Sequence, residues 1–250
     1  MGLLNDIREI QNAVNTIETP KDKFKRELAV LEPMKPSQRR VLQEYFEPGF
    51  GIEQKVGCFA KQPEIKTMSA SEYREIVKQE VTGLTIKKKA ISKLGIDEDQ
   101  VKEIQPVEFR GFIFPRGEHF YKSGCSNLYE VTWLFFSADQ LYVYSLTFDM
   151  LSDSKKERTE EYFYKDVTNF SSATDSEETV EMVVSEVKAK GCGCMKKPPK
   201  KEYKQLKTML ETAKFSIIVP GDKFSCAMEA SDDLESRIQG MKQKLREKKT

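Results

Sequence analysis

The sequence predicts an α+β protein, with a helical N-terminal region (residues 1–105) and a strand-rich C-terminal region (residues 106–250). In the first region apolar residues recur at spacings of three and four, which is the period of one helix face. In residues 126–172, Val, Tyr, Phe, Leu and Thr instead occur in short runs separated by polar turns, a composition typical of a sheet. A chain of 250 residues can bury one large core, or a smaller domain with an accessory region.

Two apolar stripes predict helices within residues 1–32. The first stripe consists of Leu3, Ile7, Ile10, Val14 and Ile17, and the second of Phe24, Leu28 and Leu31. Both keep one heptad register, so one interpretation is a coiled coil that contacts a partner protein or a second copy. The other is a helical hairpin folded onto its own domain. Pro20 favours the hairpin, because a proline inside a helix costs about 3 kcal/mol.

Further helices follow in the N-terminal region. A short helix is predicted from Ser37 to Phe46, and residues 48–68 read as a loop because they show neither helical nor strand period. Ser69 and Glu72 have the spacing of a capping box, which marks a helix start. The helices of residues 70–104 are predicted at Ala70–Val81, at Leu84–Leu94 with Gly95 after it, and in a short piece from Asp97.

The C-terminal region is predicted to be antiparallel. Strands are expected at Phe109–Phe114, Leu128–Phe136, Leu141–Asp149, Glu161–Phe170, Thr179–Lys188, Phe215–Val219 and Phe224–Met228. The second and third pair as a hairpin across residues 137–140, and the last two across residues 220–222. Ser231 starts a terminal helix whose apolar stripe is Leu234, Ile238, Met241 and Leu245. Acidic residues in its first turn and basic residues near its end complement the helix dipole.

This order of antiparallel strands and one closing helix is similar to the pleckstrin-homology-like domains of bacteria. The segment Tyr162–Val167 resembles their strand motif of tyrosine, any residue, lysine, aspartate and an aliphatic residue. Residues 214–228 and 231–248 resemble their last two strands and capping helix. The resemblance covers residues 107–248 and implies a seven-stranded antiparallel barrel. Residues 190–214 depart from the family as an insertion between two late strands.

Members of that family bind phosphoinositides, peptides or other domains, so the resemblance implies no single function. The phosphoinositide sites of eukaryotic members use basic residues in the first loop between strands. The corresponding loop here, residues 115–127, offers only Arg116, His119 and Lys122 against Glu118. The resemblance therefore does not carry that lipid site over to this chain.

The lysine-rich insertion, residues 190–214, is predicted to be an exposed loop followed by a helix from Lys201 to Thr212. It holds eight lysines and two glutamates. Lys196, Lys197, Lys200 and Lys201 can contact lipid phosphates, at about 1 kcal/mol per charge near an anionic membrane. The alternative is a solvated loop whose lysines only keep it soluble. Arginines and aromatic residues for base stacking are not interleaved there, which argues against nucleic acid.

Composition excludes several functional classes. The 41 basic and 40 acidic residues nearly cancel, so the chain has no overall field typical of a nucleic-acid binder. His119 is the only histidine, which removes multi-histidine metal sites and most histidine-based catalysis. Paired carboxylates occur only as sequence neighbours, which lie on opposite faces of a strand and do not converge. Trp133 and the aromatic residues around it are expected to form core.

The five cysteines predict reduced thiols in the cytoplasm: Cys58, Cys125, Cys192, Cys194 and Cys226. Cys192 and Cys194 lie in a Cys-x-Cys pair beside lysines. The pair allows a redox-sensitive thiol, or a zinc site completed by other cysteines and His119, but exposed reduced thiols are favoured. The N-terminus does not resemble a signal peptide, and no apolar run is long enough to span a membrane.

These observations lead to an expected function. The chain is expected to be a non-enzymatic binding or adaptor module of a bacterial cytoplasm, without cofactor or metal. The barrel and the N-terminal stripe of Leu3, Ile7, Ile10, Val14 and Ile17 would contact an unknown protein partner or a second copy. The alternative function is peripheral binding to anionic membrane lipid through residues 190–214.

Overall fold

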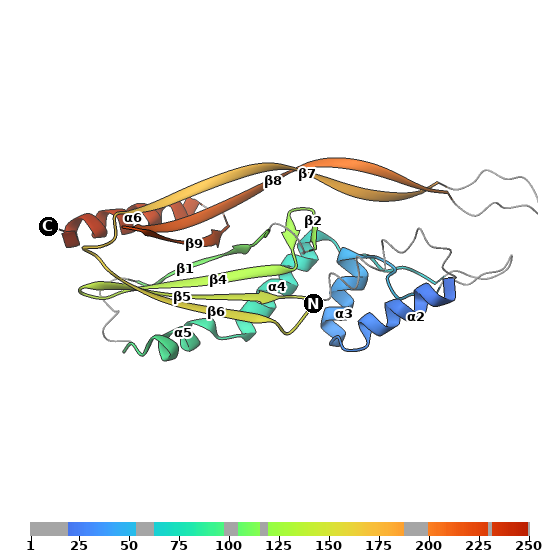
Figure 1. Ribbon diagram of the computed structural model, residues 1–250, viewed down its shortest axis with the longest axis horizontal. Coiled ribbons are helices and arrows are strands. Elements are labelled where there is room, and N and C mark those ends of the chain that lie inside the picture. The colour runs from blue at the N-terminus through green and yellow to red at the C-terminus, as the bar shows by residue number, and fades with distance from the viewer. Residues whose placement is uncertain are drawn as a thin grey trace, which may run out of the picture.

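A computed structural model describes residues 20–53, 63–97, 105–115, 120–187, 200–229 and 232–249. Within these ranges the protein is α+β, as predicted, and its sheets are antiparallel (Figure 1). The helices are α2 (Pro20–Leu31), α3 (Pro36–Val41), the π-helix η2 (Leu42–Phe46), α4 (Ala70–Gly83), α5 (Ile86–Leu94) and α6 (Asp232–Lys249). The strands are β1 (Val107–Phe112), β2 (Tyr121–Lys122), β3 (Cys125–Ser126), β4 (Leu128–Phe136), β5 (Gln140–Asp149), β6 (Lys155–Phe163), β7 (Asn169–Val187), β8 (Lys200–Val219) and β9 (Asp222–Met228).

The helix boundaries follow the predicted signals. The capping box before α4 forms: the Ser69 hydroxyl accepts from the Glu72 amide at 3.3 Å, and the Glu72 carboxylate accepts from the Ser69 amide at 2.7 Å. Gly95 ends α5 with φ +64°, a left-handed conformation that glycine adopts without strain. Helix α2 begins at Pro20, a residue that fits the first turn of a helix. The predicted helix before it and the short piece after Asp97 lie outside the described residues.

A four-stranded sheet, in the order β1-β4-β5-β6, forms the middle layer of the molecule. Its central hairpin has the predicted register, from Leu128 opposite Asp149 to Phe136 opposite Leu141. Alternate residues of β4 serve two cores. Tyr129, Val131 and Phe135 belong to the core shared with the helices, and Leu134 and Phe136 to the core shared with the second sheet. The central strands β4 and β5 are therefore buried on both faces, whereas the edge strand β6 is largely exposed.

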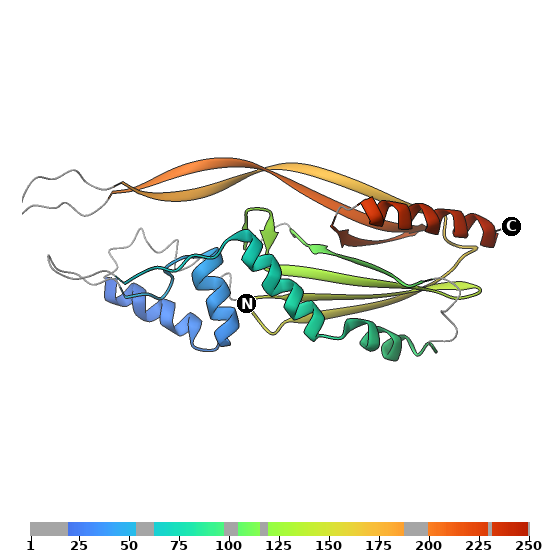
Figure 2. The same cartoon turned by 180° about the vertical axis from the view of Figure 1, so that it is seen from behind.

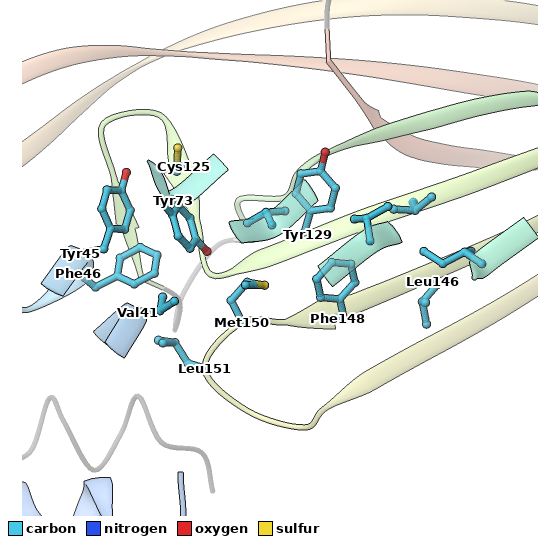
Figure 3. Close-up of a cluster of buried hydrophobic side chains, with 14 of the residues drawn as sticks. Val41, Tyr45, Phe46, Tyr73, Cys125, Tyr129, Leu146, Phe148, Met150 and Leu151 are labelled. Carbon is cyan, nitrogen blue, oxygen red and sulfur yellow. The ribbon is translucent and has the colours of Figure 1, made fainter. Parts of the chain in front are cut away.

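The helices cover one face of this sheet, and Figure 2 shows α4 and α5 lying across it. Figure 3 shows Tyr45 and Phe46 of η2 beside Tyr73 of α4, in the same cluster as Tyr129 and Phe148 of the sheet. The Tyr45 and Tyr73 rings stack with centroids 4.4 Å apart. Their hydroxyls donate to the carbonyls of Lys122 and Ser126 at 2.6 and 2.8 Å. The helices are thereby fixed to the short β2–β3 hairpin.

The second sheet, in the order β7-β8-β9, covers the other face together with α6. Phe170, Phe215, Ile217 and Phe224 supply its side of the core. The predicted stripe of α6 is confirmed where its side chains are described, because Ile238, Met241 and Leu245 are all buried in this core.

Strand β9 joins the two sheets at one corner. The Glu229 amide donates to the Arg110 carbonyl at 2.8 Å, and the Ala227 amide donates to the Glu130 carboxylate at 2.7 Å. A Cβ added to Gly111 of β1 would lie 3.2 Å from the Met228 nitrogen, so glycine permits this close approach. The Glu130 carboxylate and one backbone hydrogen bond therefore connect β9 to the first sheet. In a closed barrel, a continuous series of backbone hydrogen bonds between two strands would make this connection.

The seven-stranded barrel is accordingly not confirmed. The sheets hold four, two and three strands, the two-stranded one being the unexpected β2–β3 pair. A single strand over Glu161–Phe170 is also wrong, because β6 ends at Phe163 and β7 begins at Asn169. Between them the chain turns, with the Asp166 amide donating to the Phe163 carbonyl at 2.9 Å. Tyr164 and Val167 are buried within this turn, which explains why its apolar pattern resembles a strand.

Candidate interaction surface on the projecting hairpin

Strands β7 and β8 form one long antiparallel hairpin that extends beyond both cores. Their register is continuous from Asn169 opposite Ile218 to Val187 opposite Lys200. Strand β9 pairs with β8 only over Ala213–Val219, so the rest of the hairpin has two strands in the described chain. In Figure 1 this part runs past the end of the four-stranded sheet, above the helices, and its strands coil around each other. A strong twist is usual for two-stranded ribbons.

The hairpin leaves the core between Phe215 and Lys214. Phe215 and Ile217 are fully buried, and the Phe215 ring stacks on Phe109 at 4.3 Å. On the opposite strand, residues 172–176 are all exposed, on both faces of β7. An ion pair bridges the strands at this point, with Lys214 Nζ 3.6 Å from an Asp175 carboxylate oxygen. We call the part beyond it, residues 175–187 and 200–212, the arm.

Charge is divided between the two strands. Residues 175–186 of β7 carry five carboxylates and no lysine or arginine, whereas residues 200–214 of β8 carry five lysines and two glutamates. Glu186 and Lys201 are directly opposite in the register. Opposite charges directly across an antiparallel pair contribute roughly 0.2–1 kcal/mol, and Glu186 is the one carboxylate of the five that lies directly opposite a lysine.

The distal end of the arm has a different balance. The stretch from Val187 to Lys201 contains six lysines and no acidic residue. Val187 and Lys200 are the outermost register pair, so this stretch joins the two strands at the end remote from the core. The described lysines of this stretch, Lys200 and Lys201, therefore lie at the end of the hairpin that is remote from the core.

Two of the four predicted lysine contacts can be placed. Lys200 and Lys201 begin β8, whereas Lys196 and Lys197 lie outside the described residues. The predicted helix from Lys201 to Thr212 is wrong, because these residues form part of β8. Continuous pairing with β7 determines the conformation of these residues and outweighs their local helix preference. The predicted protein-contact stripe, Leu3, Ile7, Ile10, Val14 and Ile17, lies outside the described residues.

The described cysteines have structural positions. Cys125 and Cys226 are buried, and burial raises the pKa of both thiols. The Glu130 carboxylate adds to the increase in the pKa of Cys226. Thiolates are therefore disfavoured at both residues. Cys58, Cys192, Cys194 and His119 lie outside the described residues. Among the side chains that are described, no group of three or more potential ligands is arranged to hold a metal.

Other polar groups near the cores also connect structural elements. Glu130 accepts from the Ser145 hydroxyl at 2.9 Å and from the β9 backbone, and Tyr129 donates to Glu229 at 2.9 Å. This corner was not predicted, since a glutamate on a strand is ordinarily read as a solvated residue.

Trp133 and Tyr142 are half-buried on the helix side, and Phe135, Tyr144 and Phe148 are buried, as predicted for core.

None of the described helices is both long and apolar enough to cross a membrane. In the described chain, the β7–β8 hairpin is long, is exposed where it leaves the core, and has Lys200 and Lys201 at its distal end. Comparison with family models, curated proteins and solved structures gives no match to this chain.

Proposed function

We propose that this protein is a non-enzymatic peripheral binding module, and that the distal end of the β7–β8 hairpin binds an anionic lipid surface. One observation carries the proposal: the hairpin extends past the cores to the pair Val187–Lys200, and the sequence from Val187 to Lys201 contains six lysines. Lysines on a projecting element can approach a membrane while the body stays in water.

The expected affinity follows from the number of lysines. Each lysine near an anionic leaflet contributes about 1 kcal/mol, and the effect decays over about 8 Å at physiological salt. Six lysines give about 6 kcal/mol, a dissociation constant on the order of 10–100 µM. The acidic residues of the arm begin at Glu186, on the side of the cores, so they lie farther from the surface in this orientation.

We further propose that the two main sheets and α6 form a pleckstrin-homology-like domain with an open arrangement of strands. Its support is the chain order: a four-stranded meander, a three-stranded meander and a C-terminal helix packed on the core between them. The Tyr162–Val167 motif occupies the passage from the first sheet to the second. In this interpretation the arm is an elongation of two late strands.

Protein contact through the N-terminal stripe stays a prediction, because its residues lie outside the described ranges. The helices that follow it already bury apolar residues against the four-stranded sheet, including Tyr73, Val77 and Ala90. Those surfaces are therefore occupied within the chain, which leaves the hairpin as the better supported contact element.

The test is co-sedimentation with phosphatidylcholine vesicles, with and without phosphatidylserine, at low and physiological salt. The test variant replaces Lys196, Lys197, Lys200 and Lys201 with alanine. The control variant makes the same change in charge at four exposed lysines of the body: Lys66, Lys88, Lys156 and Lys223. We expect salt-sensitive binding that needs phosphatidylserine, is lost in the test variant and persists in the control.

A third protein separates the arm from the body. The register allows residues 175–212 to be replaced by Asn-Gly, which joins Thr174 to Ala213 through a two-residue turn. This protein is expected to keep the cores and lose vesicle binding. Binding that is equal in all variants, or absent at both salt concentrations, would refute the proposal.

A further inference from the structure

Strand β6 is a free edge of the four-stranded sheet. It pairs with β5 without a bulge from Lys155 to Phe163, and in the described chain no strand pairs with its other side. The opposite edge strand of the same sheet, β1, is by contrast reached by β9, since the Glu229 amide donates to the Arg110 carbonyl. A long, straight strand edge is able to pair with another strand.

Every second residue of β6 presents unpaired backbone groups at this edge. Just before β6, the Ser154 carbonyl accepts from the Asp149 amide of the neighbouring strand at 3.2 Å. Just after β6, the Tyr164 amide donates to the Asp139 carbonyl at 3.1 Å. Bonded and outward-pointing residues alternate along an antiparallel strand, so the odd-numbered residues of β6 point their N–H and C=O groups outward. Between residues 155 and 161, these groups form no hydrogen bond with any described group.

The charges of β6 are divided along its length. Basic residues come first and acidic residues last, with one exception. The basic residues are Lys155, Lys156 and Arg158, and the later acidic residues are Glu160 and Glu161. The exception, Glu157, forms ion pairs with Lys89 and Lys93 of α5. A strand with this pattern is complementary in charge to a second copy of itself that runs in the opposite direction.

We infer that two copies of this protein pair edge to edge through β6. The strands run antiparallel, and the two-fold axis passes through Arg158 perpendicular to the sheet. This register places Lys155 opposite Glu161 of the second copy and Lys156 opposite Glu160 of the second copy, each pair occurring twice by symmetry. The two four-stranded sheets then form one continuous sheet, with the helices of both copies on the same face.

Backbone geometry and charge together select this register. The outward-pointing residues are odd-numbered, so a register forms backbone bonds only if it places odd residues opposite odd residues. Moving the axis one residue back, to Glu157, would place that carboxylate opposite its own copy and Lys156 opposite Arg158. Like charges directly opposite each other destabilise strand pairing.

Moving the axis one residue forward is also less favourable. It would place Arg158 opposite Glu160 of the second copy, but it would place Glu157 opposite Glu161. In the inferred register the one like pair is Arg158 with its own copy. The Arg158 guanidinium is directed toward its own chain, because it donates to Glu160 at 2.6 Å and lies 5.0 Å from the centroid of the Phe224 ring.

The dimer should be weak and reversible. The paired stretch from Lys155 to Glu161 is about 23 Å long at about 3.3 Å per residue, and with a depth of about 10 Å it covers about 230 Å² of each copy. The total of about 460 Å² is far below the roughly 1,200 Å² of a stable interface, so association should need high concentration. Charges on an edge strand ordinarily protect it from pairing, and here they exclude every register except one.

The consequence for membrane binding rests on the proposed function. In Figures 1 and 2 the strands of the first sheet and the arm both run along the long axis of the molecule. Because the two β6 strands are antiparallel, the two arms point in opposite directions. The dimer would therefore connect two anionic surfaces, whereas binding of one surface by one arm does not depend on the dimer.

The test is sedimentation velocity of the full chain over a range of concentrations, with two charge-reversed variants. One variant carries Lys155→Glu and Lys156→Glu, and the other carries Glu160→Lys and Glu161→Lys. We expect the unchanged protein to form dimers as concentration rises. Each variant alone should associate at least about tenfold more weakly, because like charges then face each other across the two-fold axis.

Mixing the two variants separates contact between copies from damage within one copy. Loss of the ion pair between Arg158 and Glu160 stays in the second variant whatever it is mixed with. Mixing does restore opposite charges between the copies, so an equimolar mixture should dimerise. A monomeric unchanged protein, variants that dimerise like it, or a mixture that stays monomeric would each overturn the inference.

Amide hydrogen exchange, measured by NMR, tests whether the contact is the edge of β6. The amides of Glu157, Thr159 and Glu161 point outward, and their exchange should slow as concentration rises. The amides of Arg158 and Glu160 are the matched control, because they already bond to β5. Exchange that is independent of concentration at the three outward amides would overturn the inference. These measurements contain no vesicles, so dimerisation and vesicle binding can each fail without affecting the result for the other.

Discussion

The β4–β5 hairpin and the β7–β8 hairpin have the same antiparallel geometry but opposite surroundings. Helices cover one face of β4–β5 and the second sheet covers the other, and Val131, Leu134 and Phe135 are completely buried. Along β7, by contrast, residues 172–176 are exposed without interruption. The first hairpin is held by packing on both faces, whereas the second depends on its own cross-strand bonds once it leaves the core.

This contrast accounts for the composition of each pair. A strand buried on both faces is nearly continuously apolar, as in the stretch from Val131 to Phe136, where Thr132 is the only strongly polar residue. A strand exposed on both faces is instead mostly polar, as in residues 172–176, where Ala173 is the one apolar residue. Composition along a strand therefore reports how many of its faces are covered.

The largest expected effect is at the point where the arm leaves the core. Phe215→Ala removes a fully buried ring that stacks on Phe109 and contacts Phe170. We expect the free energy of unfolding to fall by about 3–5 kcal/mol, measured by urea denaturation. Thr174→Ala, on the exposed side of the same boundary, should change it by less than about 0.5 kcal/mol. Equal effects would contradict the boundary described here.

A smaller effect is expected at the corner between the sheets. An alanine Cβ at position 111 would lie 3.2 Å from the Met228 nitrogen and 3.3 Å from the Ala227 Cβ, so Gly111→Ala should destabilise the protein by about 1–3 kcal/mol. Nothing lies within 4 Å of a Cβ at Gly240, inside α6. Gly240→Ala should therefore stabilise by about 0.5–1 kcal/mol, through helix propensity. Thermal unfolding of both variants checks the difference in sign.

The smallest expected effect is at the charged edge of the four-stranded sheet. Glu157 of β6 pairs with Lys89 and Lys93 of α5, and the hydrogen bond from Lys89 is the main cause of its lowered pKa. A lowered carboxyl pKa stabilises the fold above the ordinary pKa, and this contribution disappears as pH falls through the lowered value. Glu157→Gln should therefore cost at most about 1 kcal/mol at pH 7 and less near pH 3.

Titration of the Glu157 carboxyl by NMR tests the cause directly. Lys89→Met removes the charged hydrogen bond while keeping the length of the side chain, and should move the Glu157 pKa back toward its ordinary value. Lys88→Met is the matched control, because Lys88 is an exposed residue of the same helix turn. A Glu157 pKa that is unchanged in the Lys89 variant would show that the ion pair is not formed in solution.

Local signals predicted much of the fold. The capping box of Ser69 and Glu72, the glycine at position 95 and the apolar stripe of α6 each depend on neighbours within one or two turns. The β4–β5 hairpin was also predictable, since its two strands are strongly apolar and joined by a short turn. In each case, residues close together in the sequence determine both the helix or strand and the point where it begins or ends.

Features that depend on distant partners were not predictable. A helix was predicted over residues 201–212, but the strand that pairs with them lies 15 to 37 residues earlier, from Glu186 opposite Lys201 to Asp175 opposite Thr212, and determines their conformation. The closed barrel was expected from the resemblance in strand order. Strand order alone does not show whether the edge strands of two sheets are hydrogen-bonded to each other. Of the candidate site, the sequence identified the lysines, whereas their position at the end of a projecting hairpin depends on the long register of β7 and β8.

That uninterrupted register has a consequence for how such a protein can change over evolution. Because side chains alternate, insertion or deletion of two residues in each strand lengthens or shortens the reach by about 6–7 Å and keeps every remaining side chain on its own face. The residues that the hairpin contributes to the described core, Phe170, Phe215 and Ile217, all lie on the body side of the Asp175–Lys214 ion pair. The hairpin can thus act as an adjustable spacer whose length is selected independently of the stability of the body.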